Sequence, residues 1–404
     1  MGGDPYGIDL EIRAKTTRSF FVFETAKMAS TDGAICALMC HLRAPHKMGA
    51  SHYRYVENSD RFFENTVSIS PSEGSGRSRV SFEVSRLGDL GHTFVLKGKL
   101  PPSAATTTLV DEFFESFELC GYAVGPGGEK EKTFAERMTL RTNNSLARAS
   151  GMEPSIAPSG EFSIPLMLRE TVDPYRCHLP LLAASGSGLR DSVQFMEFRI
   201  SLVVNGARWD NDWALDVDYV YLDREARYAL AKTDNQMPMA ICSYAVSHRE
   251  TIFSHNFKNW VISLKDGAVG FADRVTGLLI HPVDPKASFE PQRIEVLVNR
   301  HLLKTWTAHD RELSWQKVGL KNPGDGSILI PFSRDMWSDP ENAGCVNFGA
   351  IDHVDLRIIG APTPLETGDR EMEMEIEITA LNYEIRVLDA KNHTLATENL
   401  PLCK

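Results

Sequence analysis

The feature that most constrains the fold is a repeated alternation of polar and apolar residues in short segments, separated by clusters of glycine, proline, asparagine and aspartate. Successive side chains of a β-strand point to opposite faces of a sheet, so this alternation predicts strands with one buried face. In residues 79–85, two valines and a phenylalanine alternate with two serines and a glutamate. Similar patterns predict further strands at 92–100, 162–168, 194–204, 213–222, 293–298, 327–332 and 353–359.

The longest alternating run, residues 371–378, places glutamates at every second position between methionines and isoleucines. A helix would distribute these glutamates around its whole axis, whereas a strand collects them on one face. We therefore predict a strand with one charged face and one buried face. Charged side chains also discourage unwanted pairing at the edge of a sheet, which is the role expected for these glutamates.

A chain of 404 residues exceeds what a single hydrophobic core usually organises, so two domains are expected. Residues 223–232 begin with an aspartate suited to a helix N-cap and continue with good helix formers. Strand patterns lie on both sides of this segment. We predict an all-β chain with two sandwich domains at 51–222 and 237–404, a connecting helix and linker at 223–236, and an N-terminal segment of unassigned role at 1–50.

The formal net charge of −11 and the pI near 5.6 argue against direct binding of nucleic acid, because the average surface would repel phosphates. Seven scattered cysteines fit reduced thiols better than a disulfide framework. The sequence contains no apolar run near the roughly 20 residues that span a bilayer, and its first residues do not resemble a secretory signal. We therefore expect a protein made in the cytosol, with at most peripheral membrane contact.

Four potential zinc ligands lie close together at Cys36, Cys40, His41 and His46. Their spacing fits known zinc sites poorly. Reduced cysteines and surface histidines are therefore the preferred interpretation.

An acidic cluster at Asp210, Asp212, Asp216 and Asp218 could bind calcium or supply a carboxylate pair. The glycine-containing loop of common calcium sites does not accompany it. Solvated strand and turn positions are therefore preferred for these four residues.

Other segments with potential chemistry have simpler interpretations. Gly125–Gly128 lacks the lysine and hydroxyl residue of a phosphate-binding loop, so a hairpin turn is predicted. The glycosylation sequons at Asn143 and Asn392 are interpreted as turn residues. The arginines from Arg137 to Arg148 indicate either a local basic patch or part of a mixed, solvated surface. Since signatures of hydrolases, kinases and dinucleotide enzymes are missing, we predict no catalytic, cofactor-binding or metal-binding residues.

Several segments, taken in chain order, also match the hallmarks of one protein family. They are Val84–Leu90 with Leu96–Pro101, Phe117–Tyr122, Ile164–Leu166 with Leu179–Ala183, Val193–Ile200, Ile330–Ser333, Gly344–Val354 and Ala380–Leu388. The sharpest match is Asp218–Arg227, with the sequence DYVYLDREAR, which is similar to DYIYLDTEERRRF at the junction of two rolls. The sequence thus resembles the double jelly-roll major capsid proteins of nucleocytoplasmic large DNA viruses.

That resemblance implies two tandem eight-stranded antiparallel jelly rolls, each a sandwich of two sheets. It also implies a structural protein that is not an enzyme, needs no cofactor, and forms pseudo-hexagonal homotrimers tiling the icosahedral shell of a large double-stranded DNA virus. Its partners would be copies of itself, minor capsid proteins and penton proteins, and its location would be the virion. The six tryptophans would either anchor contacts between subunits or pack in the core.

The family's N-terminal segment has only partial counterparts here, at Phe20–Phe23 or Arg61–Phe63. Short loops leave two roles open besides the main shell protein: a less abundant capsid paralogue, or a receptor- or glycan-binding component of the virion. A jelly-roll enzyme is a further alternative, which predicts a bound metal or a carboxylate pair facing a cleft.

Overall fold

The structure is a computed structural model. It describes residues 62–72, 78–99, 114–125, 127–168, 171, 179–181, 195–204, 213–224, 237–253, 259–265, 271, 274–283, 289–334, 344–360, 373–389 and 394–397.

The first half of the described chain forms two antiparallel sheets. Sheet 1 has the order β1-β10-β3-β7-β6, with β8 also paired to β3, and sheet 2 has the order β2-β9-β4-β5. The strands are β1 (Phe62–Ile69), β2 (Arg79–Val84), β3 (Leu90–Lys99), β4 (Phe114–Val124), β5 (Lys130–Thr139), β6 (Ser155–Ile156), β7 (Glu161–Leu166), β8 (Leu179–Pro180), β9 (Phe195–Val204) and β10 (Ala214–Leu222).

The second half repeats this arrangement. Sheet 3 has the order β11-β19-β13-β16, with β17 paired to β13 and β20 to β19, and sheet 4 has the order β12-β18-β14-β15. The strands are β11 (Met237–Phe253), β12 (Trp260–Ser263), β13 (Arg274–Pro282), β14 (Arg293–Val298), β15 (His301–Thr307), β16 (Ile328–Pro331), β17 (Val346–Asn347), β18 (Val354–Ile359), β19 (Glu373–Asp389) and β20 (Thr394–Thr397). The helices are α4 (Leu140–Ala149), α7 (Asp310–Gln316) and the 3-10 helix η3 (Phe348–Ala350).

Both halves have the same topology once the short strands β6, β8, β17 and β20 are set aside. Numbered one to eight along each half, the remaining strands form one sheet in the order 1-8-3-6 and another in the order 2-7-4-5. Two such sheets packed face to face are a jelly roll. The predicted all-β fold of two tandem antiparallel jelly rolls is therefore confirmed, and each roll carries a helix, α4 or α7, between its fifth and sixth strands.

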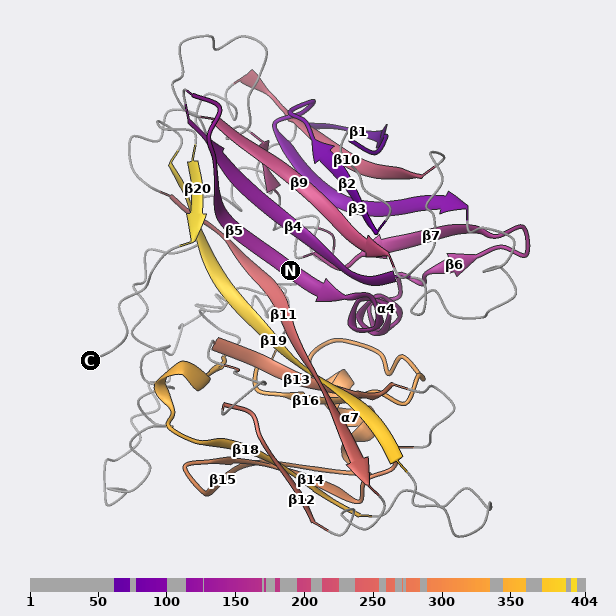
Figure 1. Cartoon of the computed structure of the whole chain (residues 1–404), viewed down its shortest axis with the longest axis vertical. Coiled ribbons are helices and arrows are strands. Elements are labelled where there is room, and N and C mark those ends of the chain that lie inside the picture. The colour runs from indigo at the N-terminus through magenta and orange to yellow at the C-terminus, as the bar shows by residue number, and fades with distance from the viewer. Residues whose placement is uncertain are drawn as a thin grey trace, which may run out of the picture.

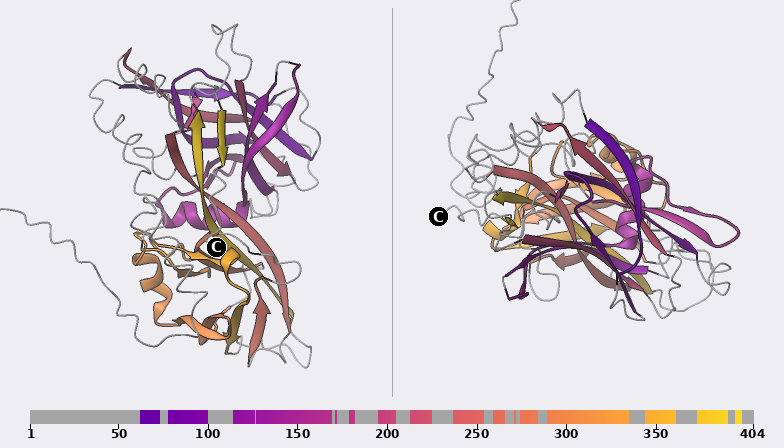
Figure 2. Two further views of the ribbon diagram at one scale, coloured as in Figure 1. Left: turned by 90° about the vertical axis from the view of Figure 1, so that its left-hand side faces the viewer. Right: turned by 90° about the horizontal axis from the view of Figure 1, so that it is seen from above.

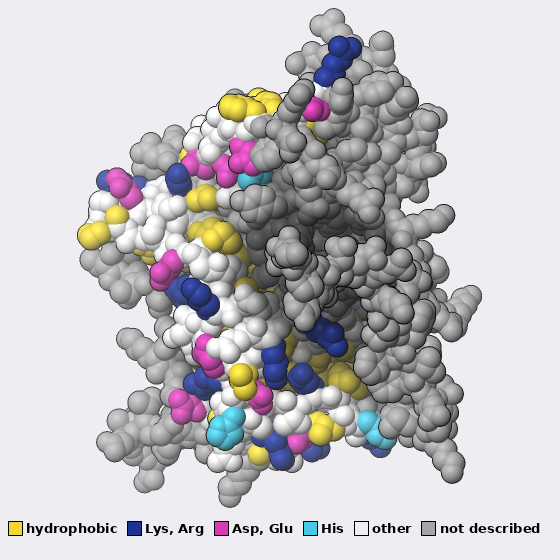
Figure 3. Space-filling view, turned by 180° about the vertical axis from the view of Figure 1, so that it is seen from behind, with side chains coloured by type: hydrophobic (Ala, Val, Ile, Leu, Met, Phe, Trp, Pro, Cys, Tyr) yellow, Lys and Arg dark blue, Asp and Glu magenta, His cyan; other side chains and the backbone are white. Residues whose placement is uncertain are grey.

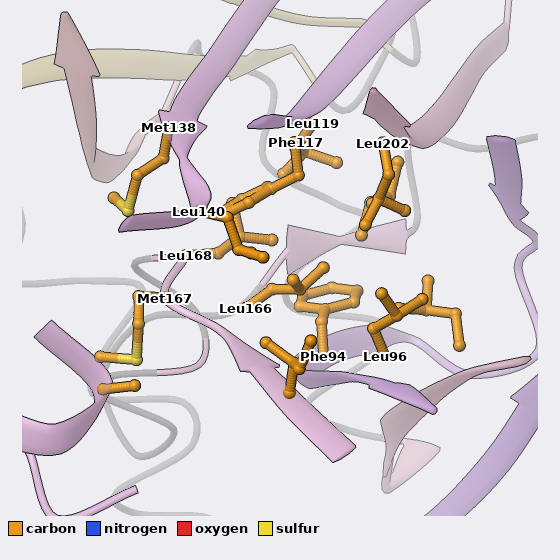
Figure 4. Close-up of a cluster of buried hydrophobic side chains, with 14 of the residues drawn as sticks. Phe94, Leu96, Phe117, Leu119, Met138, Leu140, Leu166, Met167, Leu168 and Leu202 are labelled. Carbon is orange, nitrogen blue, oxygen red and sulfur yellow. The ribbon is translucent and has the colours of Figure 1, made fainter. Parts of the chain in front are cut away.

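The core of the first roll lies between sheets 1 and 2. Phe94 and Leu96 of β3 meet Phe117 and Leu119 of β4 and Leu202 of β9, and all five are fully buried (Figure 4). Such side chains contribute roughly 1.5–3 kcal/mol each when they leave water. The alternating positions predicted from the sequence therefore form the inner faces of both sheets.

Two tight turns join neighbouring strands, and the first is the hairpin turn predicted at Gly125–Gly128. Gly128, with a φ of 80°, lies in the hairpin between β4 and β5. Asn299 and Arg300, with φ of 48° and 67°, form the two-residue turn between β14 and β15. Positive φ at both central residues gives a turn whose twist matches that of the flanking strands.

The prediction for the glutamate-rich run is only partly correct. Its described part is a strand, β19, with Glu375 exposed and Ile376 and Ile378 buried. However, β19 lies between β11 and β13 rather than at an edge, and Glu377 is only 1% exposed. The reason is tertiary, since the outer face of sheet 3 is covered by the first roll at this position.

The two rolls lie one above the other along the longest axis of the molecule, with α4 between them (Figure 1). The long antiparallel strands β11 and β19 extend between the two rolls, and β11 lies beside β5 of the first roll (Figures 1 and 2). Arg224 is helical, but residues 225–236 of the predicted connecting helix and linker lie outside the described residues.

Candidate functional site at the junction of the two rolls

The helix α4 is the central element of the junction. Thr139 is its N-cap and accepts a hydrogen bond from the backbone N–H of Thr142 at 3.3 Å. The helix ends at Ala149, after which Gly151 adopts a φ of +79° and the N–H of Met152 bonds to the carbonyl of Ala147 at 2.8 Å. A glycine in this conformation is a common helix terminator because it has no Cβ to clash. Local sequence thus defines both ends of α4.

The middle of α4 is polar and nevertheless buried, at Thr142, Asn143, Asn144 and Ser145. The Asn143 amide donates to the carbonyl of Pro165 at 3.0 Å, and its oxygen accepts from the N–H of Met167 at 2.7 Å. Burial of such groups is tolerated when they are hydrogen-bonded. The interpretation of the Asn143 sequon as turn residues was therefore wrong: Asn143 ties the helix to the end of β7.

The N-terminus of α4 meets a carboxylate from the second roll. Thr139 donates to Oε1 of Glu377 at 2.7 Å, and His281 Nε2 lies 3.7 Å from the same oxygen. The first turn of α4 contains no acidic residue of its own. A negative charge near a helix N-terminus is favourable because the backbone N–H groups there carry a partial positive charge. The second roll thus supplies the charge that the helix lacks.

A chain of hydroxyl groups continues from this carboxylate into sheet 3. The Thr142 hydroxyl lies 3.0 Å from that of Thr379, which in turn lies 2.8 Å from that of Ser247. Thr142 also lies 3.3 Å from Nε2 of His281. Each hydroxyl can donate one hydrogen bond and accept others, so the chain satisfies polar groups that water does not reach.

Two arginines of the segment 137–148 join the rolls. Arg141 donates to the carbonyl oxygens of Pro282, at 2.8 Å, and Val283, and Arg148 lies 3.7 Å from Asp325. Neither sequence interpretation of these residues, a basic patch or a mixed solvated surface, describes these contacts. Their positive charges are directed at acceptors of the second roll.

Asp325 binds the middle of α4. It accepts hydrogen bonds from the hydroxyl of Ser145 at 2.5 Å and from both the N–H, at 3.0 Å, and the hydroxyl of Ser327, at 2.5 Å. Burial by itself raises the pKa of Asp325, but these hydrogen bonds outweigh it and hold the pKa below its ordinary value. Asp325 is therefore an anionic acceptor at neutral pH.

The hydrophobic core is also continuous across the junction. The buried cluster that fills the first roll includes six residues of the second roll: Leu279, Trp315, Val318, Leu320, Leu329 and Leu381. Apolar burial of this kind resembles the interior of one domain more than a contact between independent domains. The two rolls therefore form one block.

The tryptophans support the core interpretation. Trp213, Trp306 and Trp315 are at most 1% exposed, and Trp260 packs against the core of the second roll. The remaining two, at positions 209 and 337, lie outside the described residues. The three buried tryptophans are thus core residues and do not anchor contacts between subunits.

Motifs that resemble the capsid family meet at one end of sheet 1. The Asp89 carboxylate accepts from the N–H of Leu222 at 2.8 Å, and the N–H of Asp89 bonds to the carbonyl of Val220 at 2.9 Å. A Cβ on Gly88 would lie 3.0 Å from the Cβ of Tyr219, which explains a glycine there. Segments separated by about 130 residues are thereby joined in one corner.

The acidic cluster is only partly described. Asp216 and Asp218 lie on β10, where Lys97 is 2.5 Å from Asp216 and the Thr66 hydroxyl donates to Asp218 at 2.5 Å. Burial raises the pKa of Asp216, but hydrogen bonds from Lys97 and Ser68 hold it below its ordinary value. Asp216 is buried rather than solvated, because these partners replace water.

The other metal-site hypotheses cannot be placed. The described residues do not include the remaining candidates, which are Asp210, Asp212, Cys36, Cys40, His41, His46 and the sequon at Asn392. Among the residues that are described, there is no group of three or more histidine, cysteine or acidic side chains suited to a metal ion.

None of the helices in the described ranges is long and apolar enough to cross a membrane. On the face opposite to that of Figure 1, basic and acidic side chains are interspersed (Figure 3).

No protein-family model and no curated protein matches the chain. Solved structures do match. A chain of the PBCV-1 virus capsid superposes with a TM-score of 0.58 at 15% identity, over 84% of this chain and 97% of that chain. The chain shares the fold of the PBCV-1 capsid protein. PBCV-1 VP54, fitted into a reconstruction of the virophage Sputnik, gives a TM-score of 0.59 with the same identity and coverage.

The sequence predicted most strands of the two rolls, but it did not predict the contacts of α4 at the junction between them. The polar helix α4 has no apolar face long enough to predict burial, since its central residues are threonine, asparagine and serine. The one available signal was the Thr139 N-cap, followed after the ten residues of the helix by Ser150 and Gly151.

Proposed function

We propose that this protein is a structural capsid protein of a large double-stranded DNA virus and that copies of it tile the shell. The observation that carries the proposal is the double jelly roll locked into one block by α4. A tile must keep its shape while neighbours pull on it, and the hydrogen bonds from Thr139 to Glu377 and from Ser145 to Asp325 resist movement of one roll against the other. The fold likeness to the PBCV-1 capsid supports the same role.

The assembly unit in this proposal is a homotrimer. Three blocks of two similar rolls give six similar corners around one axis, so the trimer is pseudo-hexagonal and can cover a flat facet of an icosahedral shell by repeating one set of contacts. Residues 51–222 and 237–404 form the two rolls, residues 223–236 connect them, and residues 1–50 form an N-terminal segment.

Other features of the proposal follow from this role. The protein acts in the virion after synthesis in the host cytoplasm, and its partners are copies of itself, minor capsid proteins and penton proteins. The net charge of −11 supports a protein that does not bind nucleic acid directly, and any membrane contact is peripheral. We propose no enzymatic activity, no cofactor and no catalytic, cofactor-binding or metal-binding residues.

Sedimentation velocity of the purified full-length chain tests the proposal. We expect a species of three times the 45.0 kDa chain mass, and images of that species should show a pseudo-hexagonal outline. A chain that stays monomeric at concentrations near 100 μM would contradict self-assembly. A trimer present in only a few copies per virion would favour the less abundant paralogue or the receptor- or glycan-binding component over the main shell protein.

A further inference from the structure

The contact between the two rolls is a contact between two edge strands, and the same kind of strand pair occurs a second time in the molecule. Within the chain, β11, the first strand of the second roll, lies beside β5, the fifth strand of the first roll. Both are edge strands of their sheets in the described part of the chain. Because both rolls have the same strand order, the same kind of contact has two halves that stay unused within the described residues: β1, the first strand of the first roll, and β15, the fifth strand of the second.

Both of these strands carry an exposed apolar side chain. Phe63 on β1 is 63% exposed, although its ring lies 5.7 Å from that of Tyr221, and Leu302 on β15 is 57% exposed. Leu313 on α7, the helix that corresponds to α4, is 48% exposed. Single exposed apolar residues are ordinary on protein surfaces, and Leu87, Ile156 and Val261 are exposed elsewhere. The three named here lie on the elements that have no such inter-roll contact within the described residues.

The outer faces of sheets 1 and 3 also carry the same pair of side chains. In sheet 3, His281 of the third strand is the register partner of Glu377 of the eighth strand, and this pair meets α4. In sheet 1, His92 of the third strand is the register partner of Asp218 of the eighth strand. A histidine and a carboxylate therefore stand at corresponding positions on both sheets.

The charges of β1 and β15 are complementary. Glu64, which is exposed and lies 3.7 Å from Nε2 of His92, is the only charged residue of β1. Lys304 is the only residue of β15 that is charged at neutral pH regardless of histidine protonation. Opposite charges on two facing edges favour their encounter and set their register.

From this repeat we infer that β1 of one copy docks beside β15 of a second copy, with Phe63 and Leu302 inside the contact. The inference rests on the proposed assembly and specifies its interface. Figure 1 places β1 and β15 at opposite ends of the molecule, so the two strands cannot meet within one chain. A contact between different surfaces of identical copies generates a closed ring when the rotation allows it, and otherwise a filament.

Substitutions that place charge in the contact test the inference in the full-length chain. By sedimentation velocity, we expect Phe63→Asp and Leu302→Asp each to raise the concentration needed for half-assembly at least tenfold. Val261→Asp is the matched control, because Val261 is 50% exposed on β12, at the opposite edge of sheet 4. Glu64→Lys and Lys304→Glu should each weaken assembly, and combining them in one chain should restore it.

A cross-linking experiment covers the case in which an aspartate variant does not fold. A chain carrying both Phe63→Cys and Leu302→Cys should form covalent dimers and trimers with oxidised glutathione, whereas either substitution alone should not. Suppose that the wild-type chain forms trimers. If both aspartate variants then assemble like the wild type, or if the double-cysteine chain forms no covalent dimers and trimers, this interface is overturned and the proposed function stays intact. A monomeric wild-type chain would overturn the proposed function and the interface together.

Discussion

Replacing Asn143 by alanine tests whether the polar centre of α4 holds the junction helix in place. Asn143 and Met167 are 0% exposed, and the Asn143 side chain bonds to one carbonyl and one N–H at the end of β7. Alanine would leave both backbone groups without this partner. An unsatisfied buried polar group costs about 1–3 kcal/mol, so the two together should lower the free energy of unfolding by roughly 3–4 kcal/mol.

Equilibrium unfolding in urea, followed by tryptophan fluorescence, measures this loss. Glu83→Ala is the control, because Glu83 is exposed on β2, outside the proposed contact between copies, and surface substitutions usually change stability by less than about 0.5 kcal/mol. A local readout is amide hydrogen exchange, which should become faster at Met167 in Asn143→Ala. If Asn143→Ala cost less than about 1 kcal/mol and left exchange at Met167 unchanged, the proposed clamp between α4 and β7 would be refuted.

Three further predictions concern other parts of the molecule. Trp315→Ala should lower stability by about 3–5 kcal/mol, seen as a lower urea midpoint, because it empties a fully buried site in the shared core. The depressed pKa of Asp325 gives stability that is complete above pH of about 4 and is lost as pH falls through the lower folded-state pKa, so Asp325→Asn should reduce the loss of stability between pH 6 and pH 3. Arg300→Gly should increase stability by about 0.5–1 kcal/mol, seen as a slightly higher thermal midpoint, because Arg300 has a φ of 67°, which glycine adopts without a Cβ clash. A lower midpoint would contradict this.

The strands could be read from the sequence because their signal is local. Alternation in residues 79–85 and 293–298, ended by polar and glycine-containing turns, reflects which side of a strand faces a core, and the described strands β2 and β14 lie there. The order of motifs from Val84 to Leu388 also predicted the double jelly roll, since that order is a property of the chain. These features required no knowledge of what lies opposite each sheet.

Only the tertiary structure decided which outer faces are covered. Glu377 belongs to a run that, taken alone, indicates an exposed charged face, yet it is buried because Thr139, 238 residues earlier in the chain, donates to it. Thr142 likewise belongs to a polar segment, yet it is buried where its hydroxyl meets that of Thr379, 237 residues later in the chain. A hydrogen-bond partner that distant leaves no periodic trace in the local sequence, so burial of a polar residue becomes visible only when the two rolls are placed together.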